Sequence, residues 1–107
     1  MFIHPFDDQA IMAGQGTVAL EILADLQDAD TIVAPVGGGG LISGVALAAK
    51  SINPSIKIIG VQAEVCPSAQ AALKSGSPMP VTAAASLADG INVKKMGNLT
   101  FEIVNQY

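Results

Sequence analysis

Residues 31–44 read TIVAPVGGGGLISG. An apolar run, residues 31–36, is followed by four consecutive glycines, Gly37 to Gly40, and then by a helix-like stretch that begins at Leu41. This order predicts a strand, a bare-backbone loop and the start of a helix. Glycine adopts positive φ readily and lets a ligand approach the main chain, and the free N–H groups at a helix start attract anions. We therefore expect the loop to bind a phosphate group.

The segments that follow the glycines complete an α/β unit. Residues 41–52 carry a single charge, Lys50, and are otherwise apolar or small, as in a helix buried between layers. Asn53 and Pro54 end this helix, and the apolar run 56–61 is typical of a strand covered on both faces. A β-loop-α-β unit has parallel strands and places the glycines at the carboxyl edge of the sheet, where α/β proteins bind ligands.

One helix is predicted in the N-terminal quarter of the chain, after a leading segment. A helix over residues 17–27 has one apolar face, and Gly14 and Gly16 mark its start. We expect Asp7 and Asp8 to begin a helix as caps rather than to bind a metal. The apolar face of residues 17–27 is formed by Val18, Ala19, Ile22, Leu23 and Leu26.

The second half of the chain shows three further patterns. Residues 67–75 are predicted to form a helix and residues 76–86 a loop. Residues 97–107 read as the opening of another helix, with Leu99, Ile103 and Val104 on one side. Pro35 donates no backbone hydrogen bond, so we expect it at the end of the first strand.

Composition limits what the chain can be. Half of the 107 residues are apolar, 13% are charged and the net charge is -4, which indicates one globular domain with no nucleic-acid surface. The sequence shows no signal sequence and no apolar stretch of about eighteen residues, so it indicates neither export nor a membrane span. The single cysteine, Cys66, suits the cytoplasm and is expected to be a packed thiol.

The chain is also expected to need partners. A chain this short and this apolar has more core-facing surface than it buries alone, and two strands do not make a stable open sheet. We therefore expect an internal piece of a larger protein, and a homo-oligomer formed through apolar faces and unpaired strand edges.

Two named phosphate motifs were compared with the loop. The P-loop pattern requires Gly-Lys-Ser/Thr, but Leu41 follows Gly40. In the dinucleotide pattern G-x-G-x-x-G, Gly38 and Gly40 fit the first two glycines, but Ser43 stands in place of the third. Glu64 lies only approximately where this pattern has an acidic residue, about twenty residues further on. A small non-catalytic module that binds a phosphometabolite or a dinucleotide therefore stays an alternative.

Four segments carry a family resemblance when they are taken together. They are Phe2-Ile3-His4-Pro5-Phe6-Asp7-Asp8, Ala13-Gly14-Gln15-Gly16-Thr17 with Ala19-Leu20-Glu21-Ile22, Pro35-Val36-Gly37-Gly38-Gly39-Gly40-Leu41, and Ala88-Asp89-Gly90. In this order they resemble the threonine dehydratases, the serine/threonine ammonia-lyase branch of the fold type II pyridoxal-phosphate enzymes. Within this branch, residues 62–64 and 97–100 resemble bacterial catabolic or stand-alone dehydratases more than serine racemases.

The resemblance implies a fold, a cofactor and a reaction. The fold would be part of a parallel-sheet, three-layer α/β domain, with residues 1–27 as a leading segment and helix, 31–63 as the phosphate cradle, and 67–107 as helices and loop. Pyridoxal 5'-phosphate would be the cofactor. The parent reaction would be L-threonine to 2-oxobutanoate and ammonia, with L-serine as a second substrate, in isoleucine biosynthesis or threonine catabolism. The residues implied to hold the cofactor phosphate are Gly37, Gly38, Gly39, Gly40 and Leu41.

The same resemblance implies that catalytic parts lie elsewhere. The family uses a Schiff-base lysine in a Ser-Phe-Lys context and a Ser-Gly-Asn substrate loop, and neither occurs here. No catalytic residue is therefore assigned, and we expect the chain alone to be inactive. The lysines that fail this comparison are Lys50, Lys57, Lys74, Lys94 and Lys95.

Three further candidates are a metal site, a histidine and an Asp-Gly pair. The family's racemases hold a divalent cation near the second strand, but Gln62 and Ser68 stand at two of the acidic positions, so no metal site is assigned despite Glu64. His4 is expected to be structural because no nucleophile accompanies it. The Asp89-Gly90 pair fits either a position near the cofactor or an ordinary turn.

Overall fold

Two parallel strands form the sheet. In the computed structural model, which describes residues 1–107, β1 (Thr31–Pro35) pairs with β2 (Lys57–Val61), from Thr31 opposite Lys57 to Pro35 opposite Val61. The predicted strand order and direction are confirmed. Pro35 is the last residue of β1, where it interrupts no further pairing.

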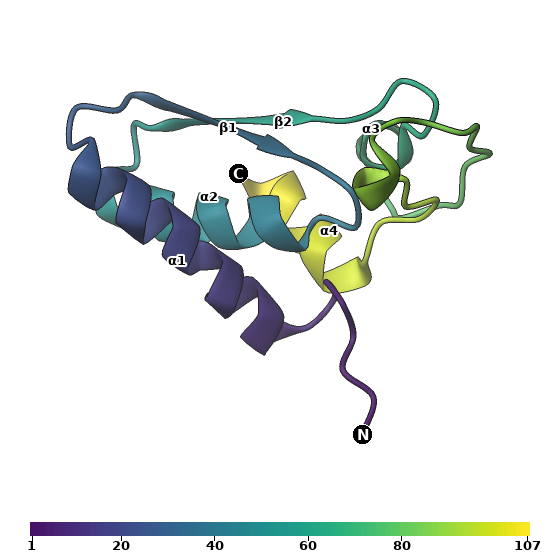
Figure 1. Cartoon of the computed structure of the whole chain (residues 1–107), viewed down its shortest axis with the longest axis horizontal. Helices are drawn as coiled ribbons and strands as arrows, with labels where there is room; N and C mark the ends of the chain where they lie inside the picture. Colours follow the sequence, from purple (N-terminus) through teal and green to yellow (C-terminus); the bar gives the residue numbers. More distant parts are fainter.

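The helices gather on one face of this sheet. Figure 1 shows α1 (Gln9–Asp25), α2 (Gly40–Ile52) and α4 (Asn98–Gln106) beneath the two strands, with α3 (Ser68–Ser75) and the short 3-10 helix η1 (Asp89–Ile91) near the carboxyl edge. The opposite face is uncovered. Val33, Ile59 and Val61 are 60%, 41% and 51% exposed there. The expectation that the second strand is covered on both faces is therefore wrong for this chain, because residues 1–107 supply helices to one face only.

Helix α2 occupies the centre of the structure. It contributes Ile42, Val45 and Ala49 to the core, and it packs beneath the sheet between α1 and α4. Its composition explains this central position, because its only charged residue is Lys50 in the last turn. The prediction of a buried helix is confirmed, with its start one residue earlier than the sequence suggested.

Helix α1 begins eight residues before its predicted start. Asp8 is its N-cap and accepts hydrogen bonds from the backbone N–H groups of Ala10, at 2.8 Å, and Ile11, at 3.3 Å. Gly16 lies inside the helix at the crossing with α2, where a Cβ would lie 3.0 Å from the carbonyl oxygen of Gly44. The glycine is thus a packing residue, and reading it as a helix start was wrong.

The buried face of α1 matches the predicted one in part. Of the five predicted residues, Ala19 is buried and Ile22 and Leu23 pack against the core, whereas Val18 and Leu26 are exposed. Met12 and Gly16, which the prediction did not include, are also buried. The contact therefore extends further toward the start of the helix than the apolar spacing indicated.

The C-terminal helix has the expected position, and Val104 of its expected apolar side packs against the core. Helix α4 spans Asn98–Gln106, and its buried residues are Thr100 and Phe101. Leu99, Ile103 and Val104 are only half-buried. Helix α3 matches its prediction within one residue, while the loop after it continues as far as Ala88. No helix combines the length and the apolar character that crossing a bilayer requires.

The crossing of α1 and α2 generates a stability prediction. In Gly44→Ala the new Cβ would overlap the Met12 carbonyl oxygen and lie 2.6 Å from the Gly16 nitrogen. We expect a loss of about 2 kcal/mol in the free energy of unfolding, since backbone atoms must move apart. Urea titration followed by circular dichroism measures this loss.

Gly14→Ala is the matched control for that substitution. Gly14 lies within α1, and a Cβ there meets no atom within 4 Å. Alanine has the higher helix propensity, so this variant should gain about 0.5–1 kcal/mol. Equal stability of the two variants would contradict a close backbone crossing.

Candidate functional site

The glycine run forms the turn from β1 into α2. Gly39 is the N-cap of α2 and has φ of 99°, a left-handed conformation that side-chain-bearing residues rarely adopt. A Cβ at this position would also lie 2.7 Å from Met96 Cε and 2.9 Å from Thr100 Oγ1. Both the conformation and the lack of space therefore require glycine at Gly39.

The backbone N–H groups of this turn have no acceptors within the chain. None of the six from Gly37 to Ile42 donates a hydrogen bond, and Ser43 is the first that does, to the Gly39 carbonyl oxygen at 3.0 Å. Gly38, Gly39 and Gly40 are buried. Buried N–H groups without partners are rare in proteins, and here they coincide with the positive end of the α2 dipole. The turn is suited to an anion with several oxygen acceptors.

A cavity of about 350 Å³ opens over the turn. The first helix supplies Ile11 and Gln15 to its wall, and Pro5 and Phe6 come from the segment before that helix. Gly90, Ile91 and Val93 close it from the C-terminal half, so Gly90 of the Asp89-Gly90 pair lies at the site. All five sequence-predicted residues, Gly37 to Leu41, line this one cavity.

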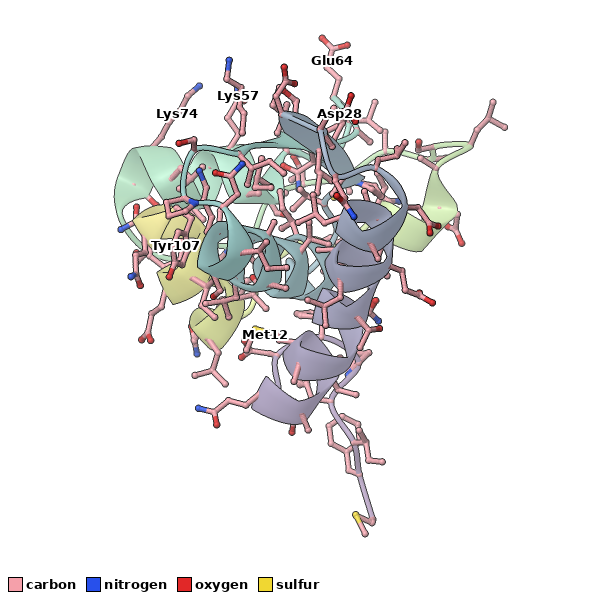
Figure 2. The ribbon with its side chains drawn as sticks, turned by 90° about the vertical axis from the view of Figure 1, so that its left-hand side faces the viewer. Met12, Asp28, Lys57, Glu64, Lys74 and Tyr107 are labelled. Carbon is pink, nitrogen blue, oxygen red and sulfur yellow. The ribbon has the colours of Figure 1, made fainter.

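No charged side chain lines the cavity. None of its thirteen lining residues is ionisable, and none of the five lysines is among them. Lys57 and Lys74 project outward into solvent (Figure 2). Attraction for an anion at this turn therefore comes from the backbone. Proton transfer by a lysine has no candidate beside the turn.

The Gly38 carbonyl oxygen is held from the side of α4, by residues to which the sequence analysis assigned no role in the site. Thr100 Oγ1 donates to the Gly38 carbonyl oxygen at 2.6 Å, and the Gly97 N–H donates to the same oxygen at 3.2 Å. Ser43 Oγ in turn donates to the Thr100 carbonyl oxygen at 3.2 Å. Thr100 and Ser43 are fully buried. Their sequence positions lie 57 apart, so no local pattern reports this contact.

Asp7 and Asp8 cap two different helices. Asp7 does not cap α1 with its neighbour, which corrects the reading of the two aspartates as caps of one helix. Its carboxylate accepts from the backbone N–H groups of α4, at 3.1 Å from Asn98, 2.8 Å from Leu99 and 3.2 Å from Thr100. The local sequence favours a cap at both positions but does not say which helix each carboxylate reaches.

His4 has the structural role expected of it. Its Nδ1 accepts from the backbone N–H groups of Asp7, at 2.9 Å, and Phe6, at 3.3 Å. Its ring also packs edge-on against Phe6, with centroids 4.6 Å apart. His4 thereby shapes the segment that places Phe6 against the glycines. Phe6 contacts Gly38, where a Cβ would overlap its ring.

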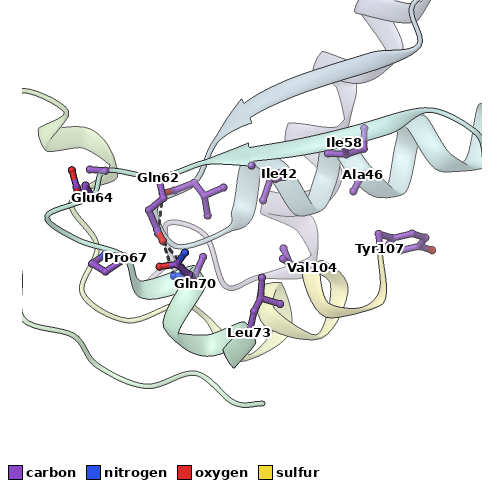
Figure 3. Close-up of a pocket in the computed structure, with 14 residues that line it drawn as sticks. Ile42, Ala46, Ile58, Gln62, Glu64, Pro67, Gln70, Leu73, Val104 and Tyr107 are labelled. Atoms are coloured by element: carbon purple, nitrogen blue, oxygen red, sulfur yellow. Dashed lines mark hydrogen bonds between the residues drawn. The ribbon is translucent and has the colours of Figure 1, made fainter. Parts of the chain in front are cut away.

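A larger cavity of about 750 Å³ lies between β2, α3 and α4 (Figure 3). Most of its lining is apolar, and its main polar group, the Gln62 amide, is already engaged. Gln62 Oε1 accepts from Ala69 N–H at 2.9 Å, while Nε2 donates to Ser68 Oγ at 3.2 Å and to the Val36 carbonyl oxygen at 3.3 Å. The free donors left in this cavity include the exposed side chains of Gln70 and Tyr107, whereas the glycine turn offers buried backbone N–H groups. The smaller cavity is therefore the better candidate for a phosphate.

Four side chains that the sequence singled out lie away from the glycine turn: Gln62, Ser68, Glu64 and Cys66. Gln62 and Ser68 bond to each other, Glu64 is exposed, and no group of three or more His, Cys, Asp or Glu side chains is placed to hold a metal ion. Cys66 is fully buried and its Sγ donates to the Val93 carbonyl oxygen at 3.3 Å. The prediction of a packed thiol is confirmed.

Comparison with known proteins gives consistent relatives. The family described as "Pyridoxal-phosphate dependent enzyme" matches residues 1–107. An L-threonine ammonia-lyase of Thermotoga maritima is 56% identical over 107 residues, which are 100% of this chain and 27% of that protein. The processed form of threonine deaminase isoform 2 from Solanum lycopersicum superposes with a TM-score of 0.93 at 40% identity, over 97% of this chain and 30% of its own.

A third relative has a different named activity. Maize serine racemase superposes with a TM-score of 0.90 at 41% identity, over 96% of this chain and 32% of its own. The chain thus spans less than a third of the length of each of these relatives.

These matches confirm the resemblance to the threonine dehydratases and the α/β fold with a parallel sheet that the glycine segment indicated. They also confirm pyridoxal phosphate as the cofactor of the family. The chain belongs to the pyridoxal-phosphate-dependent enzymes of fold type II.

Proposed function

We propose that this chain forms the cofactor-phosphate site of an L-threonine ammonia-lyase, which converts L-threonine to 2-oxobutanoate and ammonia and also accepts L-serine. The observation that carries the proposal is the run of six backbone N–H groups without acceptors, from Gly37 to Ile42, around one cavity. Gly37, Gly38, Gly39, Gly40 and Leu41 would hold the phosphate of pyridoxal 5'-phosphate.

The residues present fit that group. A phosphate has several acceptor oxygens in a compact tetrahedron, which suits N–H groups converging from a tight turn. The glycines leave the N–H groups uncovered, and the α2 dipole adds attraction without a cation. When bound, pyridoxal phosphate supplies an electron sink that eases loss of the substrate's Cα proton. The chain's own part is to bind and orient the cofactor.

The substrate is proposed from the relatives. The Thermotoga maritima and Solanum lycopersicum proteins are named for threonine, and both share at least 40% of their aligned residues with this chain. The maize protein, named as a serine racemase, supports serine as a second substrate class. Residues 1–27 would be the leading segment and helix, 31–63 the phosphate cradle, and 67–107 the helices and loop around it.

The surface and charge of the chain bear on its assembly and partners. The uncovered sheet face, with exposed Val33, Ile59 and Val61, supports association with further protein. We propose a homo-oligomer in the cytoplasm. Neither a nucleic acid nor a membrane is proposed as a partner, because the net charge is -4 and no helix is suited to span a bilayer.

Calorimetric titration with pyridoxal phosphate and with pyridoxal tests the phosphate site. We expect the chain to bind the phosphorylated compound and not pyridoxal. The free N–H groups of the turn form strong hydrogen bonds to the charged oxygens of a phosphate, and pyridoxal has no such group. In Gly39→Ala, binding should fall at least about tenfold, since a φ of 99° and the contacts to Met96 and Thr100 both resist a Cβ.

Gly14→Ala, which lies away from the turn, should bind like the unchanged chain. Equal affinity for both compounds would contradict a phosphate site at the glycines. Preference for a nucleotide over pyridoxal phosphate would instead favour the non-catalytic binding module.

An activity assay tests the division between binding and chemistry. The purified chain should form no 2-oxobutanoate from L-threonine, because no lysine lines the cavity. Replacing the matching segment of the Thermotoga maritima enzyme by this chain should keep ammonia-lyase activity, since the two are 56% identical over that length. The unaltered Thermotoga maritima enzyme is the control. Activity of the isolated chain would contradict the proposed division.

A further inference from the structure

The Gly38 carbonyl is held from outside the turn by the first residues of α4. It accepts both the Thr100 hydroxyl, at 2.6 Å, and the Gly97 N–H, at 3.2 Å. A distance of 2.6 Å lies at the short end of the range for O–H···O hydrogen bonds. Because Thr100 is fully buried, water does not compete for its hydroxyl. These two donors fix the direction of this one carbonyl.

A fixed carbonyl also fixes the N–H group of the same peptide unit. The peptide bond from Gly38 to Gly39 is trans, so the Gly39 N–H points opposite to the Gly38 carbonyl. It therefore points away from α4. No residue of α4 lines the cavity over the turn. The hydrogen bond from Thr100 to the Gly38 carbonyl oxygen therefore directs the Gly39 N–H away from α4, where it is free to bind a ligand.

Helix α4 is itself placed by Asp7. Three N–H groups of its first turn bind the Asp7 carboxylate, across 91 to 93 positions of sequence. These N–H groups have no acceptor inside α4, and a carboxylate also complements the helix dipole there. A Cβ at Gly97 would overlap the Asp7 carboxylate, so the glycine keeps this approach open.

We propose that Asp7 and Thr100 are positioning residues for the phosphate-binding turn. Asp7 seats the start of α4, and Thr100 passes that placement to the Gly38–Gly39 peptide, whose N–H then faces the bound phosphate. Neither residue lines the cavity, so both act through the turn rather than on the ligand. The inference rests on the proposed function, because it takes the phosphate of pyridoxal phosphate as the ligand.

Two substitutions at Thr100 separate the hydroxyl from the methyl group. Thr100→Val keeps the shape and removes the donor, whereas Thr100→Ser keeps the donor and removes the methyl. We expect the dissociation constant for pyridoxal phosphate, measured by calorimetry on the full chain, to rise about tenfold in Thr100→Val and to stay within about twofold in Thr100→Ser. A packing role would give the opposite order.

An amide spectrum gives a second readout of the same variants. Adding pyridoxal phosphate should shift the Gly39 amide resonance in the unchanged chain and in Thr100→Ser. The shift should be much smaller in Thr100→Val, because the Gly38–Gly39 peptide is no longer held. A full shift in Thr100→Val would overturn the role of Thr100.

Asp8 provides a matched control for Asp7. Each aspartate caps one helix, α4 for Asp7 and α1 for Asp8. Asp7→Ala and Asp8→Ala should therefore lower the unfolding midpoint by similar amounts. Only Asp7→Ala should raise the dissociation constant for pyridoxal phosphate, by about tenfold. Equal dissociation constants in the two variants would overturn the role of Asp7.

The outcomes distinguish the inference from the proposed function. If the unchanged chain does not bind pyridoxal phosphate, the proposed phosphate site fails and the inference fails with it. If the unchanged chain and Thr100→Val bind equally well, only the positioning inference is overturned. Should Thr100→Val lose its native circular dichroism, the Asp7→Ala and Asp8→Ala pair decides by the same binding criterion.

Discussion

The carboxylate of Asp7, bound to the first turn of α4, joins the two ends of the chain. Gly97 and Thr100, which donate to the Gly38 carbonyl oxygen, lie at the same end of α4 as the three N–H groups that the Asp7 carboxylate binds. The segment that carries Asp7 also carries Phe6, which covers Gly38. The short segment around Asp7 thus contacts both the support behind the turn and part of the wall in front of it. The cavity lies between parts of the chain that are about 90 positions apart.

The charge distribution of the chain favours anion binding through short-range hydrogen bonds rather than through long-range attraction. A net charge of -4 repels a phosphate at long range, and no lysine or arginine compensates at the turn. Backbone N–H groups act over one hydrogen-bond length and have fixed directions, so they select for the placement of acceptor oxygens as well as for charge. This requirement accounts for Gly38 and Gly39 in particular, because a Cβ at Gly38 would collide with Phe6 and one at Gly39 with Met96 and Thr100.

Local sequence was sufficient for the strand, the turn, helix α2 and the second strand, because adjacent residues decide each of them. The apolar run, the glycines and Asn53 with Pro54 mark those boundaries without any distant contact. The sequence failed where two distant segments meet. Gly16 looked like a break and is a crossing point with Gly44, and the partners of Asp7 and Thr100 lie 91 and 62 positions away. The exposed face of β2 was also misjudged, since its apolar residues predict coverage but not which segment provides it.

Binding the phosphate and carrying out the chemistry place different demands on a chain. In the proposed function the first demand is met by peptide groups, so it needs only a correctly shaped turn and the residues that hold it, and all of these lie within residues 4–100. Proton transfer requires an ionisable side chain at the cofactor, and the cavity has none. In this proposal the chain supplies the groups that hold the phosphate, and the reactive lysine comes from another part of the enzyme. Such a division would let the turn fix the cofactor's position while a separate element supplies and moves the proton.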